Sequence, residues 1–448
     1  MSFSGCQIQS IYGKYIPIFL IAYQNNIVMN ILVITNSTWD DRNSFGNTLS
    51  NWFGEWRDSK FSCITFRSEI PNNKICVDYY VVSPIDVAKH ILLPWKIGRR
   101  YTSETIPSKS VVAEGKVVGI KGVKRRVIIH ALDFLYKLPF WRNKKYKQFI
   151  QDVNPDIVFL FATADAFVCQ NVKYIKSHTK AKIIISAEDD VYGAVSDSND
   201  FLSIVQKRRY EKMFLVADKL YGASQMMCDA YKTIFNKTFY PIYKGCEFVG
   251  IRDDVNSPVE MVYAGNLLYG RLDTLSSIAN SLREINKNEL KIRLTVFSGT
   301  KVQKEDVLAI NDGRSVVFAG QKPFEEIKDI LRKADITLHV ESFEPERQKQ
   351  VRYSFSTKII DCLQSGNTMM VVGPKGIASV EYPRIIPGAI VVDDINDICC
   401  VLNDIVQESN TLVKNAKLIN AFAIEHHDIT HVRASLKNDF MGLMDNGF

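Results

Sequence analysis

The stretch YSFSTKIIDCLQSGNTMMVVGP, residues 353–374, decides the fold, because a loop of small residues leads into a predicted helix and then a buried strand. Ser354, Ser356 and Thr357 are small or hydroxylated residues that let backbone amides approach a ligand. A helix that begins at Lys358 directs its N-terminal N–H groups to the same place, and a diphosphate fits there. An ordinary helix–strand unit of an α/β domain has similar features, so this segment alone leaves both interpretations open.

Two charged side chains belong to the same predicted helix. Lys358 places a mobile cation in the first turn, where the helix dipole by itself favours an acid. Asp361 lies one turn further on and can accept two hydroxyl hydrogen bonds, as from a ribose. Gly366 ends the helix, and the apolar run MMVVG predicts a short buried strand.

The length and composition predict a soluble protein with two domains. A chain of 448 residues is too long for one ordinary core, and 46% hydrophobic with 23% charged residues is typical of globular proteins. The nine cysteines are odd in number and form no C-x-x-C pair, which favours reduced thiols in the cytoplasm and suggests no structural zinc. Residues 15–39 carry no charge, but IPIFLIAY is too short to span a bilayer. We expect residues 1–28 to be a poorly ordered extension, with a transmembrane helix as the less favoured alternative.

Strands and helices alternate from Met29 onward, which predicts two doubly wound, Rossmann-like α/β domains facing a central cleft. Ligands of such sheets bind beyond the carboxyl ends of the strands. The expected strands lie at 30–35, 76–82, 155–162 and 181–190 in the first half, and at 261–265, 294–299, 316–320, 335–341 and 389–394 in the second. The expected divisions are an N-terminal domain at 29–243, a C-terminal domain at 244–425, and a helix at 426–448 that packs back toward the N-terminal domain.

The stretch 353–374 resembles the C-terminal domain of retaining GT-B glycosyltransferases, especially the family 4 enzymes of bacterial capsular and exopolysaccharide synthesis. That family usually carries two Glu residues eight positions apart, with a Gly-rich loop between them. Here the second Glu corresponds to Asp361, the loop to residues 354–358, and the first Glu to Tyr353, which is a departure. A polysaccharide-building subset shows the same S-T-K-I-x-D-x-L-x-S-G form.

The resemblance implies how a nucleotide-sugar donor is bound. The turn YAGNLLYGR, residues 263–271, matches a family turn whose cation contacts the diphosphate, so Arg271 and Lys358 are expected to stabilise the charge that grows as the sugar departs. Glu341 is expected to take over part of the work of the carboxylate missing at Tyr353, with a solvated loop acid as the alternative. The implied donor-binding residues are Gly265, Asn266, Gly320, Gln321, Glu341, Ser354, Phe355, Ser356, Thr357 and Asp361.

Acidic loops after two N-terminal strands are expected to face the cleft from the acceptor side. The loop NSTWDDRNSFGNTLSN, residues 36–51, offers the first set, and AEDDVYG, residues 187–193, the second. No D-x-D motif is present, and GT-B enzymes generally need no metal, so we expect no metal and no cofactor. His426, His427 and His431 lack H-E-x-x-H order and are expected on an exposed helix. The expected acceptor-binding residues are Asp40, Asp41, Gly46, Asp189, Asp190 and Tyr192.

A basic block covers residues 94–147, with fourteen Lys and Arg against three Asp and Glu, although the whole chain is only +7. No nucleic-acid recognition module accompanies it, so we expect no nucleic-acid partner. A solvated charged face is one interpretation, and contact with anionic lipid headgroups is the favoured one. The expected membrane-binding residues are Trp95, Lys124, Arg125, Arg126, Trp141, Lys144 and Lys145.

Taken with the resemblance, these patterns predict a glycosyltransferase that moves a sugar from a nucleotide-sugar to a lipid-linked or oligosaccharide acceptor in bacterial surface polysaccharide synthesis. We expect it in the cytoplasm, peripherally associated with the inner face of the cell membrane. The resemblance implies a retaining, metal-independent transfer. The alternatives are a GT-B nucleotide-sugar epimerase and a non-catalytic scaffold of a polysaccharide assembly complex. Walker, G-x-S-x-G and G-x-G-x-x-G motifs are absent from the sequence, which gives no support to ATPase, hydrolase or dinucleotide oxidoreductase chemistry.

Overall fold

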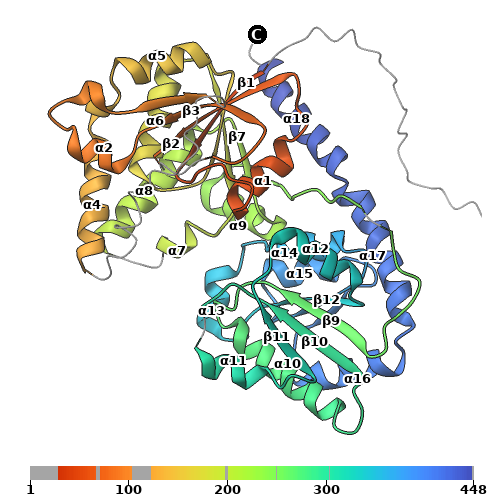
Figure 1. The fold of residues 1–448 in the computed structure, drawn as a ribbon. Coiled ribbons are helices and arrows are strands. Elements are labelled where there is room, and N and C mark those ends of the chain that lie inside the picture. The colour runs from red at the N-terminus through yellow and green to blue at the C-terminus, as the bar shows by residue number, and fades with distance from the viewer. Residues whose placement is uncertain are drawn as a thin grey trace, which may run out of the picture.

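A computed structural model describes residues 29–66, 71–102, 123–196, 200–248, 250–301 and 303–445, and the expected extension 1–28 lies outside them. Each half of the chain forms a mainly parallel sheet covered by helices on both faces (Figure 1). The predicted class, two Rossmann-like doubly wound domains, is confirmed. Among the described residues, no helix combines the length and the apolar character that a bilayer crossing requires.

The N-terminal sheet has eight strands in the order β4-β3-β2-β1-β5-β6-β7-β8. Only β4 is antiparallel to its neighbour, and it forms the edge opposite β8. The strands are β1 (Met29–Thr35), β2 (Ser59–Thr65), β3 (Cys76–Val81), β4 (Arg99–Thr102), β5 (Ile157–Phe161), β6 (Lys182–Ala187), β7 (Lys219–Gly222) and β8 (Tyr240–Pro241). The helices are α1 (Ser44–Phe53), α2 (Pro84–Lys89), η1 (Pro94–Lys96), α4 (Val123–Lys137), η2 (Pro139–Trp141), α5 (Lys144–Val153), α6 (Ala166–His178), α7 (Gly193–Ser196), α8 (Phe201–Val216) and α9 (Gln225–Phe235).

The C-terminal sheet has six parallel strands in the order β11-β10-β9-β12-β13-β14. The strands are β9 (Val259–Ala264), β10 (Ile292–Phe297), β11 (Val316–Gly320), β12 (Ile336–Val340), β13 (Thr368–Val372) and β14 (Ile390–Val392). The helices are α10 (Arg271–Ile285), α11 (Lys304–Ile310), α12 (Phe324–Lys333), α13 (Pro345–Val351), α14 (Lys358–Gln364), α15 (Ala378–Arg384), η3 (Ile395–Asp397), α16 (Ile398–Gln407), α17 (Thr411–His427) and α18 (Ile429–Asp445).

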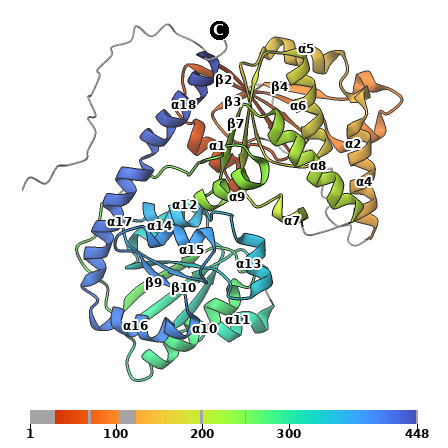
Figure 2. The ribbon, with the colours of Figure 1, turned by 180° about the vertical axis from the view of Figure 1, so that it is seen from behind.

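The core of each sheet consists of strands that are buried on both faces, because helices cover both sides. β12 and β13 are buried along their whole length. On one face of the N-terminal sheet the core is strongly aromatic, and the last helix, α18, contributes Phe440 to it. Phe440 lies 5.3 Å from Trp56 and 5.9 Å from Phe53 between ring centres. The final helix therefore belongs to the N-terminal core, while α17 lies against the other domain (Figures 1 and 2).

The chain passes between the domains twice, at neighbouring points. The outward passage runs through Gly245 and Cys246, and the return runs through Asp428, between α17 and α18. The Cys246 amide donates to the carbonyl of His427 at 2.6 Å, and the Ile429 amide donates to the carbonyl of Cys246 at 3.2 Å. A Cβ at position 245 would lie 2.4 Å from the Ile429 Cα, so this crossing of two backbones requires glycine.

His427 is fully buried at this crossing, so the expectation that it lies on an exposed helix is wrong. The end of α17 runs into the junction between the domains, and aromatic rings cover the imidazole. Its Nε2 lies 2.6 Å from the hydroxyl of Tyr382, and its Nδ1 lies 3.3 Å from the carbonyl of Lys244. Burial lowers the pKa of His427 to about 4.

Candidate functional site

The loop before α14 is held mainly by hydrogen bonds within the protein. The amide of Ser356 donates to Ser379 Oγ at 2.8 Å, the amide of Ser354 donates to the Val351 carbonyl at 3.1 Å, and the amide of Lys358 donates to Ser356 Oγ at 3.4 Å. In this structure the protein itself supplies the acceptors of these three amides, and the expected contact of the loop with a ligand stays a prediction. These hydrogen bonds hold the loop at the edge of the sheet where ligands of doubly wound sheets bind.

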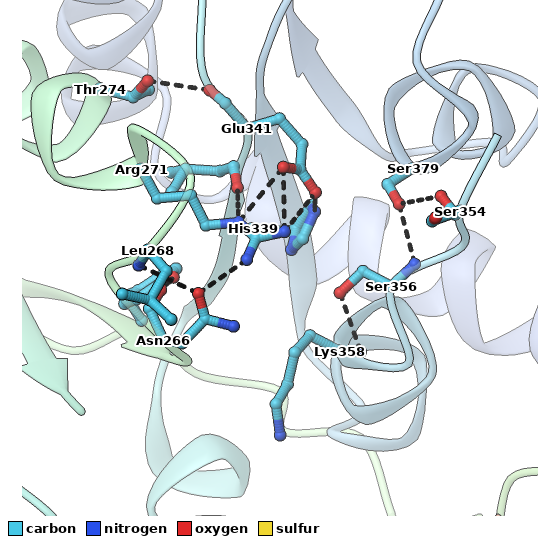
Figure 3. A network of polar contacts seen from close by, with 12 residues as sticks. Asn266, Leu268, Arg271, Thr274, His339, Glu341, Ser354, Ser356, Lys358 and Ser379 are labelled. Carbon is cyan, nitrogen blue, oxygen red and sulfur yellow. Dashed lines mark hydrogen bonds and ion pairs between the residues drawn. The ribbon is translucent and has the colours of Figure 1, made fainter. Parts of the chain in front are cut away.

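Lys358 and Asp361 project from the first turn of α14. Lys358 Nζ lies 2.9 Å from Asp361 Oδ2, with 41% of the Lys358 side chain exposed. In Figure 3 the Lys358 side chain extends away from the loop that precedes it. The partly exposed amine is positioned to exchange its carboxylate partner for an anionic ligand, because exposed ion pairs contribute only about 0–1 kcal/mol.

Arg271 forms a buried ion pair with Glu341. The two residues are 70 positions apart in the chain and meet because β9 and β12 are neighbouring strands. Arg271 Nη2 lies 2.9 Å from Glu341 Oε1, and Arg271 Nε donates to the Val340 carbonyl at 3.1 Å. His339 Nε2 lies 3.0 Å from the same Oε1 (Figure 3). Burial raises the pKa of Glu341, but the His339 hydrogen bond and the Arg271 charge outweigh it, so that pKa is lowered overall.

Asn266 completes this network. Its Oδ1 accepts from Arg271 Nη1 at 2.9 Å and from the Leu268 amide at 3.1 Å. Asn266 occupies the position where the resemblance leads us to expect a cation, and it holds Arg271 in place. Only 11% of the Arg271 side chain is exposed. The guanidinium is therefore preorganised, with its charge already countered by Glu341. Glu341 holds Arg271 in place through this pair.

The carboxyl ends of the C-terminal strands bring the remaining donor-side residues together. The amide of Gly265 donates to the Phe297 carbonyl at 3.1 Å, and Gly320 accepts from the Ser298 amide at 2.9 Å. Gly320 has a φ of 70°, which favours glycine at this turn. Gln321 follows it as an exposed residue. The turns after β9, β10 and β11 thus lie side by side, beyond the strand ends where a ligand is expected.

Phe355 packs at the crossing between the domains, and its expected place among the donor-binding residues stays a prediction. Its ring centre lies 4.9 Å from that of Tyr243 and 5.3 Å from that of Tyr382, both at the crossing between the domains. The preceding Tyr353 accepts at its carbonyl from the hydroxyl of Ser224 in the N-terminal domain at 2.7 Å. The aromatic rings therefore pack the loop before α14 against the crossing between the domains.

A polar cavity of about 200 Å³ lies between the domains. Asp41 lines it from the N-terminal domain, and Asp361 and Lys328 line it from the C-terminal domain. Lys244, from the outward passage, donates through Nζ to Asn47 Oδ1 at 2.5 Å, and burial lowers its pKa. The structure thus brings Asp41, expected on the acceptor side, and Asp361, expected on the donor side, to one cavity. Lys244 and Lys328 were missed by sequence reasoning, because a lysine in an apolar segment or on an amphipathic helix carries no local signal.

Two other residues of the first acceptor loop have structural roles. Asp40 pairs with Arg42 at 2.6 Å, and the hydrogen bond from Arg42 is the main reason that its pKa is lowered. Gly46 is buried, and a Cβ there would lie 2.2 Å from the Asp40 carbonyl oxygen. The expectation that Gly46 gives a substrate close access is therefore wrong, because the space in front of it holds the backbone of its own loop.

The second acceptor loop contributes one residue to the domain interface. Asp190 accepts from the Tyr231 hydroxyl at 2.9 Å, and its amide lies 3.4 Å from Ser354 Oγ of the opposite domain. Asp189 is exposed. Tyr192 is buried, and its hydroxyl donates to Glu211 of α8 at 3.1 Å, so its expected acceptor contact is wrong.

Glu188 precedes these two aspartates and was missed by sequence reasoning. Burial raises its pKa to about 7, although a 2.5 Å hydrogen bond from the Ser186 hydroxyl opposes that shift. A carboxyl group with a raised pKa at the end of a strand is a candidate for a functional site. Its only sequence signal is its place directly after the buried run of β6.

The expected membrane residues divide into three groups. Trp95, Lys144 and Lys145 are exposed. Trp141 is fully buried, and its indole N–H donates to the Tyr136 carbonyl at 3.0 Å, so its expected membrane contact is wrong. The turn of η2 directs this ring into the core. The side chains of Lys124, Arg125 and Arg126 lie outside the described residues. No group of three or more potential metal ligands occurs in the part of the chain that the structure describes.

No protein-family model matches the sequence, and no curated protein matches it. The structure is similar to that of sucrose-phosphate synthase from Thermosynechococcus elongatus, with a TM-score of 0.60, 11% identity, and coverage of 93% of this chain and 99% of that chain. HepE from Anabaena in complex with UDP gives a TM-score of 0.60 at 12% identity, covering 92% of this chain and 100% of that chain. The UDP-forming α,α-trehalose-phosphate synthase from Burkholderia xenovorans, in complex with glucose-6-phosphate, gives 0.57 at 9% identity, with 92% and 100% coverage. The chain has the GT-B fold of these structures.

Proposed function

We propose that this protein is a glycosyltransferase that moves a sugar from a nucleotide-sugar donor to a lipid-linked or oligosaccharide acceptor. The observation that carries the proposal is the meeting of charged groups from the two domains at the strand ends. Lys358 and the Arg271–Glu341 pair lie on the C-terminal side, and Asp41 shares a cavity with Asp361. A GT-B neighbour in complex with UDP and another described as UDP-forming support a uridine nucleotide as the first donor to try.

The proposed transfer proceeds with retention and without a metal ion. Lys358 binds the diphosphate and counters the charge that develops as the sugar leaves, and Arg271 supplies a second, fixed cation. Asp361 binds the ribose, and the departing phosphate takes the acceptor proton. The setting is synthesis of a bacterial surface polysaccharide in the cytoplasm, with the protein peripherally bound at the inner face of the membrane.

The test is to incubate the purified protein with a panel of nucleotide-sugars, with and without lipid extract, and to follow nucleotide release. We expect release from one donor only, dependent on an acceptor and unaffected by EDTA. Conversion of the donor to an isomeric nucleotide-sugar without an acceptor would replace the proposal with an epimerase. Failure of calorimetry to detect binding of any nucleotide-sugar would favour a scaffold.

A further inference from the structure

An apolar loop stands out from the edge of the N-terminal domain opposite β8. It consists of residues 91–95, Ile-Leu-Leu-Pro-Trp, which follow α2 and run into η1 ahead of β4. Leu92 is 86% exposed, Trp95 is 61% exposed and Ile91 is 43% exposed. Large apolar side chains exposed together on a soluble domain mark an interaction site.

Cations border this apolar loop. Lys89 and Lys96 flank it and are exposed, and Lys144 and Lys145 begin α5 beside it. The nearby acids are already paired, since Asp86 accepts from Arg99 at 3.5 Å and Asp78 accepts from Arg100 at 2.7 Å. Within the described residues none of these four lysines has an ion-pair partner. The surface around the loop is therefore positive as well as apolar.

A groove of about 530 Å³ opens under Trp95, and we call it the lipid groove. The exposed side chain of Trp95 supplies its main apolar surface, because the rings of Tyr80 and Phe149 that also line it are each only 1% exposed. Arg100, Lys144 and Lys145 line it as cations. A ligand that matches this lining has an apolar body and an anionic head. The volume is in the range of about 300–1,000 Å³ that small-molecule sites occupy.

We propose that this face docks on an anionic lipid bilayer, with the apolar loop in the interfacial region and the lipid groove holding the head and upper chain of one anionic lipid. Trp95 suits the interface because its ring is amphipathic, and the lysines keep their charges in the headgroup layer. The inference deepens the proposed function by giving the acceptor-bearing membrane a defined docking surface. It rests on that function only for its biological setting.

The distribution of tryptophans makes the contact measurable. Trp39, Trp52, Trp56 and Trp141 are each at most 5% exposed, so Trp95 is the one tryptophan of the five within reach of a bilayer. The experiment titrates the full-length protein with vesicles of phosphatidylglycerol and phosphatidylcholine, and with phosphatidylcholine alone. Lipids brominated along the chain quench the fluorescence of an inserted indole. We expect quenching with the anionic vesicles only, and its loss in Trp95→Phe, which still co-sediments.

Substitutions separate the apolar and the charged contributions. Leu92→Ser with Trp95→Ser should weaken co-sedimentation at least about tenfold, because the loop then has little apolar surface to bury. Lys144→Gln with Lys145→Gln should weaken it about 30-fold, which corresponds to about 2 kcal/mol. The matched controls are Leu308→Ser, at a residue 70% exposed on α11, and Lys287→Gln with Lys291→Gln on the C-terminal domain. These controls should bind as the parent protein does.

Unquenched Trp95, or equal binding by the loop variant and its control, would overturn the proposal. Self-association without vesicles that the loop substitutions abolish would assign the face to a second copy of the chain instead. Binding to vesicles requires no nucleotide-sugar, so a failure to bind vesicles can be distinguished from a failure of the proposed transferase activity. Nucleotide release with a water-soluble acceptor should be unchanged in all loop and lysine variants, whatever the vesicles show.

Discussion

Lys358 is the residue whose removal tests the proposed chemistry most directly. Its side chain is 41% exposed, pairs with Asp361 of its own helix and lies 6.0 Å from the ring centre of Phe324, so Lys358→Ala should leave the free energy of unfolding nearly unchanged. The loss of one preorganised charge stabiliser should lower kcat about 100-fold or more. Steady-state nucleotide release measures this. Lys349→Ala is the matched control, because Lys349 forms a similar exposed pair with Glu346. Equal kcat values for the two variants would show that Lys358 does not take part in the site.

Arg271 differs from Lys358 because it is buried against Glu341. Arg271→Ala leaves that carboxylate buried with His339 as its remaining partner, and this should cost about 3–5 kcal/mol of stability in addition to activity. Chemical denaturation measures the loss. Arg332→Ala, at an exposed pair with Asp329, should cost less than about 1 kcal/mol. Arg271→Met with Glu341→Leu should regain much of the stability without regaining activity. A stable but inactive Arg271→Ala would show that the pair does not support the fold.

At the scale of elements, the end of α17 gives the fold a pH dependence. Burial lowers the pKa of His427 to about 4 from 6.5, so the unfolded chain binds the proton more readily between these values. The contribution of neutral His427 to stability is fully present above about pH 6.5 and is lost as the pH falls toward 4. The thermal unfolding midpoint should therefore drop more steeply over this range than in His427→Gln, which cannot titrate. Parallel pH profiles for the two proteins would contradict this assignment.

Some elements could be predicted from sequence because their signal is local. The apolar and charged positions of α5 and α12 follow a helical period, and β11 is a short apolar run ending in glycine. By contrast, β2 was missed, because SKFSCIT reads as polar although the sheet buries five of its seven residues. The helix α13 was missed in a highly charged stretch with no buried face.

The candidate site was only partly predictable, for a related reason. The sequence pointed to Arg271, Lys358 and Asp361, and the structure places them at the strand ends. It did not reveal that Arg271 is paired with a buried carboxylate, because its partner Glu341 is 70 residues away and is brought near by the pairing of β9 with β12. Likewise, nothing local to Phe355 indicates that its ring packs on Tyr243. Contacts between distant segments depend on sheet order, which no local pattern encodes.

At the scale of the whole molecule, α18 is a structural part of the N-terminal domain. Phe440 is fully buried among Phe53, Trp56 and Phe159, so Phe440→Ala should destabilise that domain by about 3–5 kcal/mol. Fluorescence-detected unfolding reports on it, because Trp56 lies against the ring. Met441→Ala, at the neighbouring and exposed position, is the control. Unfolding curves that coincide for the two variants would show that α18 is not required for the core.

The position of Phe440 also affects how the protein is made. During synthesis the strands of the first domain leave the ribosome long before the helix that completes their aromatic core. Roughly 280 residues separate Phe159 from Phe440, which at 5–20 residues per second is a delay of about 15–55 s. Throughout that interval the aromatic core residues of the N-terminal domain are not yet covered by α18. The N-terminal domain therefore reaches its final packing only after α18 has left the ribosome, and translation rate and chaperone supply become determinants of yield.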